Sequence, residues 1–439
     1  MKIFWFTERA YHDEDPVKLR ELEDEVISSQ SFWGTPNSRF DPKVGAKLLN
    51  QYLDEKIYTD EHLQEFDGVM LNEHHGNPFC LGAVMDVEAA ILARTTKRLK
   101  IALIGNPIPV SGNPLRLAEE LAMIDLISGG RLIPGWIRGA GCEQLSNNAN
   151  PAFNREYFEE GHDLILQAWT RPGPFRFEGK HFHYRHVNPW VKPLQQPHPL
   201  IVTPGLVSPE TAVWCAKRRY PYIALATFLE PTTQLWEIYA KAAAAEGYQA
   251  GPENFGYLQP IFVSRDQKYA EEMGKRFLYG GSFAHFARPE WMFPPGYNSK
   301  EATRRLAQAM ANPNYPGKTL VTDKNDIEKA RENIYANYEQ NRSALQMIAG
   351  TPEHVIPRLK TVLNVLRTGI FTFWLDGPVP HEDRLECLRL LNSEVIPELR
   401  QHARKLGIVD PFEMAPGSRP LPAGGSYEAV SNKEAIVTY

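Results

Sequence analysis

Short apolar runs alternate with longer amphipathic stretches along most of this chain. The short runs are typical of buried parallel strands, and the longer stretches between them follow the period of helices. We expect strands in eight segments: residues 2–6, 68–71, 100–104, 132–137, 199–203, 222–227, 256–263 and 370–375. Helices are expected over residues 43–57, 83–94, 114–127, 153–170, 209–217, 231–246, 352–367 and 382–405. This alternation predicts parallel βαβ units, and eight of them predict an α/β fold of the closed (β/α)8 TIM barrel type rather than an open doubly wound sheet.

Other segments lie outside the alternation. Residues 175–186 alternate aromatic and polar side chains and predict a surface hairpin. Residues 9–41 and 274–343 are long insertions, which in barrels often form lids or binding loops. We therefore expect a barrel domain over residues 1–409, which includes a lid-like insertion near 274–343, followed by an extended C-terminal tail over residues 410–439.

The second insertion contains the aromatic segment Phe277–Tyr297, which Gly and Pro residues interrupt. Such a segment is a poor helix but a suitable lid over an apolar organic substrate, with His285 as a polar contact. The alternative is that these rings only pack the insertion onto the barrel.

Composition excludes several classes of partner. The net charge of -5 and the sequence pI of 6.3 do not predict a nucleic-acid surface. No apolar run reaches the length of about 18 residues that a membrane helix needs. The N-terminus turns acidic after one short apolar run, so it does not resemble a secretory signal. Four scattered cysteines without a C-x-x-C pair predict free thiols in the reducing cytoplasm and no zinc site.

The clearest chemical signal follows the second expected strand, where an apolar run ends in Asn72, Glu73, His74 and His75. The carboxyl ends of barrel strands form the active-site face. Adjacent residues on an extended chain point in opposite directions, so one histidine faces the site and the other packs outward. Histidine suits catalysis because it exchanges a proton near neutral pH. The alternative is a pair of structural histidines that hydrogen-bond to the backbone.

Two further places suit an anion. Arg138 ends the fourth expected strand beside Gly139, where its guanidinium could reach a phosphate, although a surface ion pair is the alternative. Ser208 and Thr211 open the helix expected from residue 209, and a helix N-terminus with hydroxyls also binds phosphate. The alternative is that Ser208 simply caps this helix. Pro209 lacks an N–H group, which changes the amide pattern there.

Three segments together resemble the bacterial luciferase-like flavin-dependent monooxygenases: NEHHGNPF, ALIGNPIPVSGNPLRLAEELAMIDLISGGRLIPGWIRG and VSPETAVW. The resemblance resumes at Gly350-Thr351-Pro352-Glu353. It implies a (β/α)8 barrel that binds reduced flavin mononucleotide (FMN) at its C-terminal face. It makes His74 the catalytic residue beside the flavin ring. The cofactor-binding residues that it implies are Glu73, His75, Asn106, Arg138, Ser208 and Thr211.

The family also carries a non-prolyl cis peptide after the third strand. In this chain the bond Asn106–Pro107 involves proline, so the place and presence of a cis bond remain open.

The resemblance implies a two-component enzyme. A separate flavin reductase would supply reduced FMN, and O2 would form a C4a-peroxyflavin that the protein protects from water. The product would be an oxygenated, most simply hydroxylated, apolar organic molecule. The absence of a G-x-G-x-x-G fingerprint after a strand favours a separate reductase. The resemblance also implies a homodimer formed through the helices beside the second and third strands.

Three alternatives use the same barrel. The first is a deazaflavin (F420)-dependent oxidoreductase that transfers hydride without oxygen. The second is a non-catalytic flavin-binding barrel, against which the presence of both His74 and Arg138 counts. The third is a metal-dependent hydrolase that uses the two histidines. No second histidine cluster ends another expected strand, so we predict no metal site.

Overall fold

The structure is a computed structural model that describes residues 1–29, 32–206, 208–225, 228–277, 291, 293–304 and 326–412. The strands are β1 Lys2–Phe6, β2 Gly68–Leu71, β3 Lys100–Leu103, β4 Asn106–Pro107, β5 Leu132–Ile133, β6 Trp136–Ile137, β7 Phe175–Glu178, β8 His183–Val187, β9 Thr203–Gly205, β10 Tyr222–Leu225, β11 Phe255–Val263, β12 Ile348–Gly350 and β13 Ile370–Trp374. The α-helices are α1 Pro16–Ser29, α2 Pro42–His62, α3 Met85–Thr95, α4 Ile108–Ser111, α5 Pro114–Ser128, α6 Gly141–Ser146, α7 Asn154–Thr170, α8 Pro209–Arg218, α9 Leu229–Ala245, α10 Gln267–Arg276, α13 Ile327–Ser343, α14 Pro352–Leu366, α15 His381–Leu390 and α16 Ile396–Lys405.

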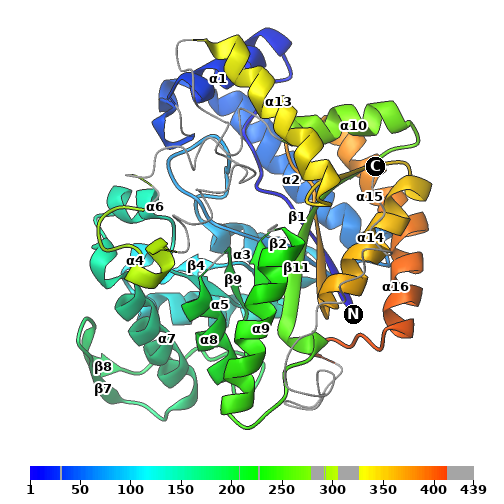
Figure 1. Ribbon diagram of the computed structural model, residues 1–439. Coiled ribbons are helices and arrows are strands. Elements are labelled where there is room, and N and C mark those ends of the chain that lie inside the picture. The colour runs from blue at the N-terminus through cyan, green and yellow to red at the C-terminus, as the bar shows by residue number, and fades with distance from the viewer. Residues whose placement is uncertain are drawn as a thin grey trace.

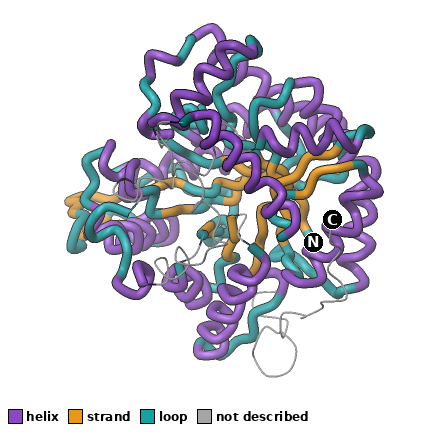
Figure 2. Tube along the Cα trace, turned by 45° about the horizontal axis from the view of Figure 1, so that its top comes forward, coloured by secondary structure: helices purple, strands orange, loops and turns teal. Residues whose placement is uncertain are grey.

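The central strands form a parallel barrel. Their order is β5-β3-β2-β1-β13-β11-β10-β9, and every neighbouring pair is parallel. A parallel bridge between Gly135, two residues after β5, and Val202, just before β9, links the two ends of this order. Figure 2 shows the strands at the centre with helices around them. The expected (β/α)8 barrel is therefore confirmed.

Two expected strands differ from the structure. The fourth, expected over residues 132–137, is divided into β5 and β6, and β6 pairs with β4 instead of β3. The physical reason lies between the two pieces. Pro134 has no N–H group to donate to a ladder, and a Cβ atom on Gly135 would lie only 2.3 Å from the carbonyl oxygen of Leu103. The fifth, expected over residues 199–203, is β9, which begins only at Thr203.

The barrel core has two layers. One face of each strand points inward, where ten residues form a cluster: Phe4, Phe6, Met70, Ala102, Ile104, Ile133, Val202, Ile223, Leu258 and Ile370. The other face packs under the helices, as Ile3 and Trp5 do on β1. Strands covered on both sides need continuous apolar sequences, and this need explains why short apolar runs predict them.

The insertions pack together above the barrel. Helix α1 from the first insertion lies against α13 from the second, at the top of Figure 1. Arg331 on α13 pairs with Glu23 and Asp24 on α1, and Arg20 on α1 pairs with Glu328. Most of the aromatic segment expected to form a lid, including His285, lies outside the described residues, as does the tail beyond Phe412.

Smaller elements complete the molecule. The expected hairpin is confirmed as the antiparallel pair β7–β8. The unexpected strand β12 pairs with the C-terminal part of β11. The helix expected over residues 382–405 is α15 and α16 joined by a π-helical turn at Leu391–Val395. None of the helices in the described ranges has the length and apolar character that crossing a membrane requires.

Candidate functional site at the barrel mouth

His74 lies between two carboxyl groups at the C-terminal end of β2. Its Nδ1 atom is 2.7 Å from Oε1 of Glu143, and its Nε2 atom is 3.7 Å from Oε2 of Glu8. Glu143 stands on the short helix α6 and is fixed there because it accepts the backbone N–H of Ala140 at 2.8 Å. The imidazole therefore has a fixed partner on one nitrogen and a looser acidic neighbour on the other.

This arrangement favours the charged form of the imidazole. Burial opposes the charge, but the carboxylates of Glu143 and Glu8 outweigh burial and raise the pKa of His74 to about 9. Burial likewise opposes the charge of Glu143, yet the neighbouring His74 holds the pKa of Glu143 below its ordinary value. Both shifts favour an imidazolium that donates a hydrogen bond to a carboxylate.

His75 has a separate partner. Its Nε2 atom is 3.1 Å from Oε1 of Glu73, and this hydrogen bond outweighs burial and raises the pKa of His75. The other oxygen of Glu73 accepts the backbone N–H of Met85 at 3.1 Å, at the start of α3. The indole of Trp33 donates to the carbonyl of His75 at 2.8 Å. Glu73 thus orients His75 and accepts a hydrogen bond from the first residue of α3. The acidic neighbours of His74 are instead Glu143 and Glu8.

Two buried acids at the same mouth were missed from the sequence. Glu8 follows β1, and Asn72 donates its side-chain amide to the Glu8 carboxyl group. Asp376 follows β13 and accepts the backbone N–H of Glu8 at 3.2 Å and the indole N–H of Trp374 at 3.1 Å. Burial raises the pKa of Glu8, and burial together with Glu8 raises the pKa of Asp376 to about 7. The pair therefore retains protons that exposed carboxyls would lose.

Arg9 secures the chain segment that carries Glu8. Its guanidinium donates to the carbonyls of Thr7 at 3.0 Å and Asn72 at 2.6 Å. Its Nε atom lies 3.1 Å from a carboxylate oxygen of Glu88. The guanidinium fills the space above Gly82, where an added Cβ atom would lie 1.7 Å from it. Arg9 itself has a φ of 61°, a left-handed conformation that non-glycine residues adopt rarely.

The segment after β3 contains the cis peptide bond, which is Ile104–Gly105 and not Asn106–Pro107. Asn106 donates its backbone N–H to the carbonyl of Gly135 at 2.8 Å. Its side-chain amide donates to both carboxyl oxygens of Asp86 at 3.1 Å. Among the described residues, the side-chain oxygen of Asn106 is buried without a hydrogen-bond partner. This oxygen is free to accept a hydrogen bond from a bound ligand.

Arg138 is available for an anion. Its guanidinium donates to the side chain of Asn154 at 3.3 Å and to the carbonyl of Tyr297 at 3.1 Å, and it lies 5.1 Å from the centre of the Tyr297 ring. No carboxylate in the described ranges forms an ion pair with it. The surface ion pair considered as the alternative is therefore not observed there.

A second arginine, missed from the sequence, stands beside it. Burial and the charge of Arg138 lower the pKa of Arg155, so two like charges are held close together. The Arg155 guanidinium also donates to the Ser208 hydroxyl at 3.4 Å. Two crowded guanidinium groups are stabilised when an anion binds between them. Arg155 lies on an ordinary amphipathic helix, where its sequence position carries no signal.

The hydroxyls at the start of α8 belong to the same cluster. Ser208 occupies the N-cap position, but its side chain makes no capping hydrogen bond, contrary to the simple capping alternative. Instead the Thr211 hydroxyl donates to Ser208 Oγ at 3.2 Å, and Ser208 donates to Glu210 at 3.0 Å. Paired guanidinium groups, hydroxyls and a helix N-terminus together have the donor chemistry of a phosphate site, and so they fit the phosphate of FMN.

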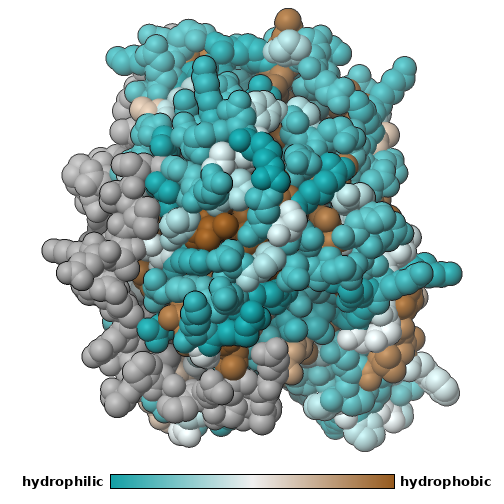
Figure 3. Space-filling model, turned by 90° about the vertical axis from the view of Figure 1, so that its right-hand side faces the viewer, coloured by the Kyte–Doolittle hydropathy of each residue, from teal (hydrophilic) through white to brown (hydrophobic). Residues whose placement is uncertain are grey.

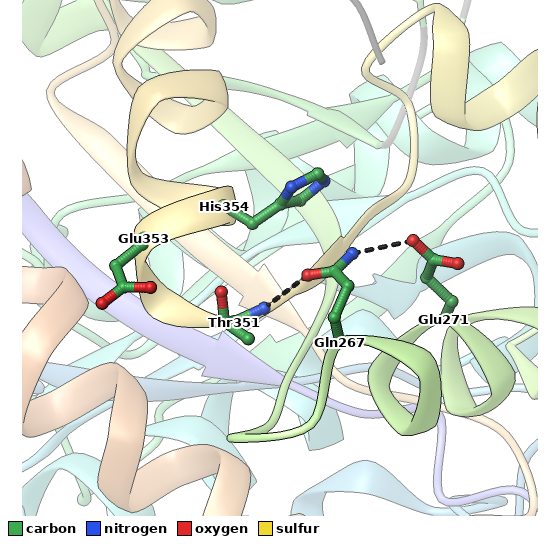
Figure 4. A pocket seen from close by; sticks show the side chains of 5 residues that line it. All are labelled: Gln267, Glu271, Thr351, Glu353 and His354. Carbon is green, nitrogen blue, oxygen red and sulfur yellow. Dashed lines mark hydrogen bonds between the residues drawn. The ribbon is translucent and has the colours of Figure 1, made fainter.

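A pocket of about 490 Å³ lies elsewhere, between α10 and α14. Figure 4 shows Gln267 between Thr351 and Glu271. Gln267 accepts the Thr351 backbone N–H at 3.0 Å and donates to Glu271 at 2.7 Å. None of the residues predicted to bind flavin lines this pocket.

Comparison with known proteins places the whole arrangement in a family. Residues 65–368 match the model of the luciferase-like monooxygenases. The chain is 25% identical over 218 residues to the alkanal monooxygenase alpha chain of Photobacterium leiognathi. The aligned residues are 48% of this chain and 60% of that relative. It is 23% identical over 347 residues to the oxygenase component of the flavin-dependent trigonelline monooxygenase of Acinetobacter baylyi. This alignment covers 75% of this chain and 84% of that relative.

A solved structure shares the fold. It is the oxygenating constituent of the 3,6-diketocamphane monooxygenase of Pseudomonas putida in complex with FMN. The TM-score is 0.59 at 19% identity, over 80% of this chain and 93% of that one. Since the family match extends over more than half of the sequence, the chain belongs to the luciferase-like monooxygenase family.

Proposed function

We propose that this protein is the oxygenase component of a two-component flavin-dependent monooxygenase. It takes reduced FMN from a separate reductase and uses O2 to oxygenate, by hydroxylation, an apolar organic substrate. The observation that carries the proposal is the position of His74, held between Glu143 and Glu8 at the barrel mouth. The relative described as an oxygenase component supports the division of labour with a reductase.

The chain's own residues have distinct tasks in this proposal. Bound reduced FMN supplies the electrons that activate O2. Arg138, Arg155, Ser208 and Thr211 hold its phosphate, and the free side-chain oxygen of Asn106 accepts a hydrogen bond from the ring system. His74 supplies a proton from Nε2 to the reacting group. Glu143 keeps the imidazole in place through Nδ1.

Packing beside the mouth favours an apolar substrate. The ring of Trp374 lies 5.5 Å from that of Phe6 and 5.0 Å from that of Phe277, the first residue of the aromatic insertion. These rings form an apolar wall next to Asp376.

All four cysteines are free and buried, which suits a cytoplasmic protein.

The test is rapid mixing of the protein, loaded with reduced FMN without oxygen, against oxygenated buffer. We expect oxidised flavin to appear much later than in a protein-free control, because a site that protects the oxygenated flavin from water delays its breakdown. His74→Ala should shorten this delay. Appearance of oxidised flavin at the protein-free rate would contradict the proposal, and oxidation of reduced F420 without oxygen would support hydride transfer instead.

Binding is tested separately. Arg155→Ala should weaken the binding of reduced FMN about tenfold or more, which corresponds to the loss of one charge-assisted contact of about 1.5–3 kcal/mol. Arg116→Ala is the matched control. Arg116 is exposed, and within the described part of the chain its ion pair is with Glu120, four residues later on the same helix. Equal affinities of the two variants would remove Arg155 from the phosphate site.

A further inference from the structure

Three buried carboxyl groups converge at the barrel mouth from distant parts of the chain. Glu8 follows β1, Glu143 lies on α6, and Asp376 follows β13. The hydrogen bond to the Glu143 carboxylate occupies Nδ1 of His74. Glu8 stands near the other nitrogen, Nε2, at 3.7 Å. Nε2 is the atom that gives up a proton in the proposed reaction, so the residue beside it influences that step.

Glu8 is held firmly in this place. Its side chain accepts a hydrogen bond from Asn72, and its backbone N–H donates to Asp376. Only 5% of Glu8 is exposed. The neighbouring Arg9 is tied to Glu88 and to backbone carbonyls, so its positive charge acts on Glu8 without a direct ion pair among the contacts recorded for the described residues.

Burial and the acidic neighbours of Glu8 raise its pKa, while its basic and amide neighbours lower it. His74, Arg9 and Asn72 stabilise the carboxylate, whereas Glu143 and Asp376 oppose it. Burial is the largest influence, and it raises the pKa of Glu8 above that of an exposed glutamate. Glu8 therefore keeps a proton to a higher pH than an exposed glutamate, and its carboxyl group lies 3.7 Å from Nε2 of His74.

Building on the proposed function, we propose that Glu8 positions His74 and returns a proton to its Nε2 atom during turnover. When His74 gives its Nε2 proton to the reacting group, the O–H bond of Glu8 breaks and a new N–H bond forms on Nε2. Glu8 then remains as a carboxylate beside the imidazolium and regains a proton from solvent between turnovers. A small rotation of the Glu8 side chain, or one bridging water, spans the 3.7 Å.

The first experiment needs no flavin. The imidazole signals of isotopically labelled histidine are followed by NMR as a function of pH in the wild type and in Glu8→Gln. We expect His74 to titrate at about 9 in the wild type and about one pH unit lower in the variant, because one neighbouring carboxylate is removed. The control is Glu14→Gln, since Glu14 is exposed on the same segment and pairs with Lys47. An unchanged His74 midpoint in Glu8→Gln overturns the proposal.

If Glu8→Gln does not fold, a titration of the wild type alone tests the proposal. In protein labelled at the glutamate carboxyl carbon, the Glu8 signal should respond in the pH range in which His74 titrates. A single step at the ordinary value of 4.5, without a response to His74, overturns the proposal.

The second experiment separates proton return from mere packing. The delay before flavin oxidation is measured against pH in the wild type and in Glu8→Gln. We expect a several-fold shorter delay in the variant at low pH, with the difference shrinking as the pH rises and Glu8 in the wild type loses the proton that it would return. Parallel pH profiles overturn proton return. If the wild type shows no delay, the proposed function fails, and the histidine titration still decides whether Glu8 controls His74.

Discussion

At the scale of single residues, Asp376 links the barrel mouth to the stability of the fold. Burial and Glu8 raise the pKa of Asp376 from 3.8 to about 7, so the folded protein binds a proton that the unfolded chain releases at lower pH. The stability that this proton supplies is complete below pH 3.8 and is lost as the pH rises toward 7. The free energy of unfolding should fall in that window.

Replacement of Asp376 by Asn removes this titration. Between pH 4 and 7, the wild type should lose on the order of 2–4 kcal/mol of unfolding free energy relative to Asp376→Asn. Chemical denaturation at several pH values measures the difference. Asp54→Asn, at an exposed position on α2, should follow the wild type. Curves for Asp376→Asn that run parallel to the wild type would show that Asp376 is already ionised in the fold.

The residues of the site differ in how far the sequence reveals them. Glu8 and Asp376 each stand two residues beyond the end of a strand, as Glu73 does, so the rule that singled out Glu73 applied to them too. Glu143 lies on a six-residue helix, which is too short for a periodic sequence pattern to predict. Arg155 faces Arg138 only because of how α7 packs against the barrel. Tertiary packing brings Glu143 and Arg155 to the site. The residues that neighbour them in the sequence do not encode this packing.

At the scale of elements, Arg331 joins α13 to α1, two helices that are far apart in the sequence. Its side chain is 8% exposed and pairs with Glu23 and Asp24 on α1. Arg331→Leu leaves Glu23 without its ion pair and Asp24 with only the exposed Arg20, and it should loosen α13 by about 2–4 kcal/mol. Limited proteolysis should then cut the second insertion faster. Arg20→Leu, which breaks the exposed pair with Glu328, should change the rate little. Equal rates for both variants would contradict this role.

The elements themselves were largely predictable, because buried parallel strands require apolar runs and helices between them require an apolar stripe. Prediction was wrong where the backbone, and not the side chains, decides. The run Leu132–Ile137 is apolar throughout, yet Pro134 and Gly135 divide it. The strand β12 has only three residues, too few to show a period.

At the scale of the whole molecule, an apolar surface indicates assembly. Large apolar side chains are exposed on and beside α3 and α5, which pack against each other: Val84, Val87, Ile91, Met123, Leu126 and Ile127. By contrast, the side of the molecule that carries α14 and α16 is mostly hydrophilic (Figure 3). A second copy of the chain that covered the α3–α5 face would remove this apolar area from water.

We therefore expect a homodimer that depends on this face. The double variant Val87→Glu and Met123→Glu should sediment as a monomer, because it would bury four carboxylates at the interface of a symmetric dimer. Val17→Glu, at an equally exposed valine on α1, should not change the oligomeric state. A wild-type protein that sediments as a monomer, or a double variant that remains dimeric, would exclude this interface.

The close approach of Arg9 to Gly82 restricts how the sequence can change over time. A side chain at position 82 would collide with the guanidinium that ties the first strand's loop to the second, so a larger residue at position 82 also requires a change at position 9. Within the family, the two positions should vary together: where an arginine stands at position 9, position 82 should stay glycine. Where a smaller residue replaces that arginine, larger residues should appear at position 82, and such exchanges would mark lineages whose barrel mouths are held together by different contacts.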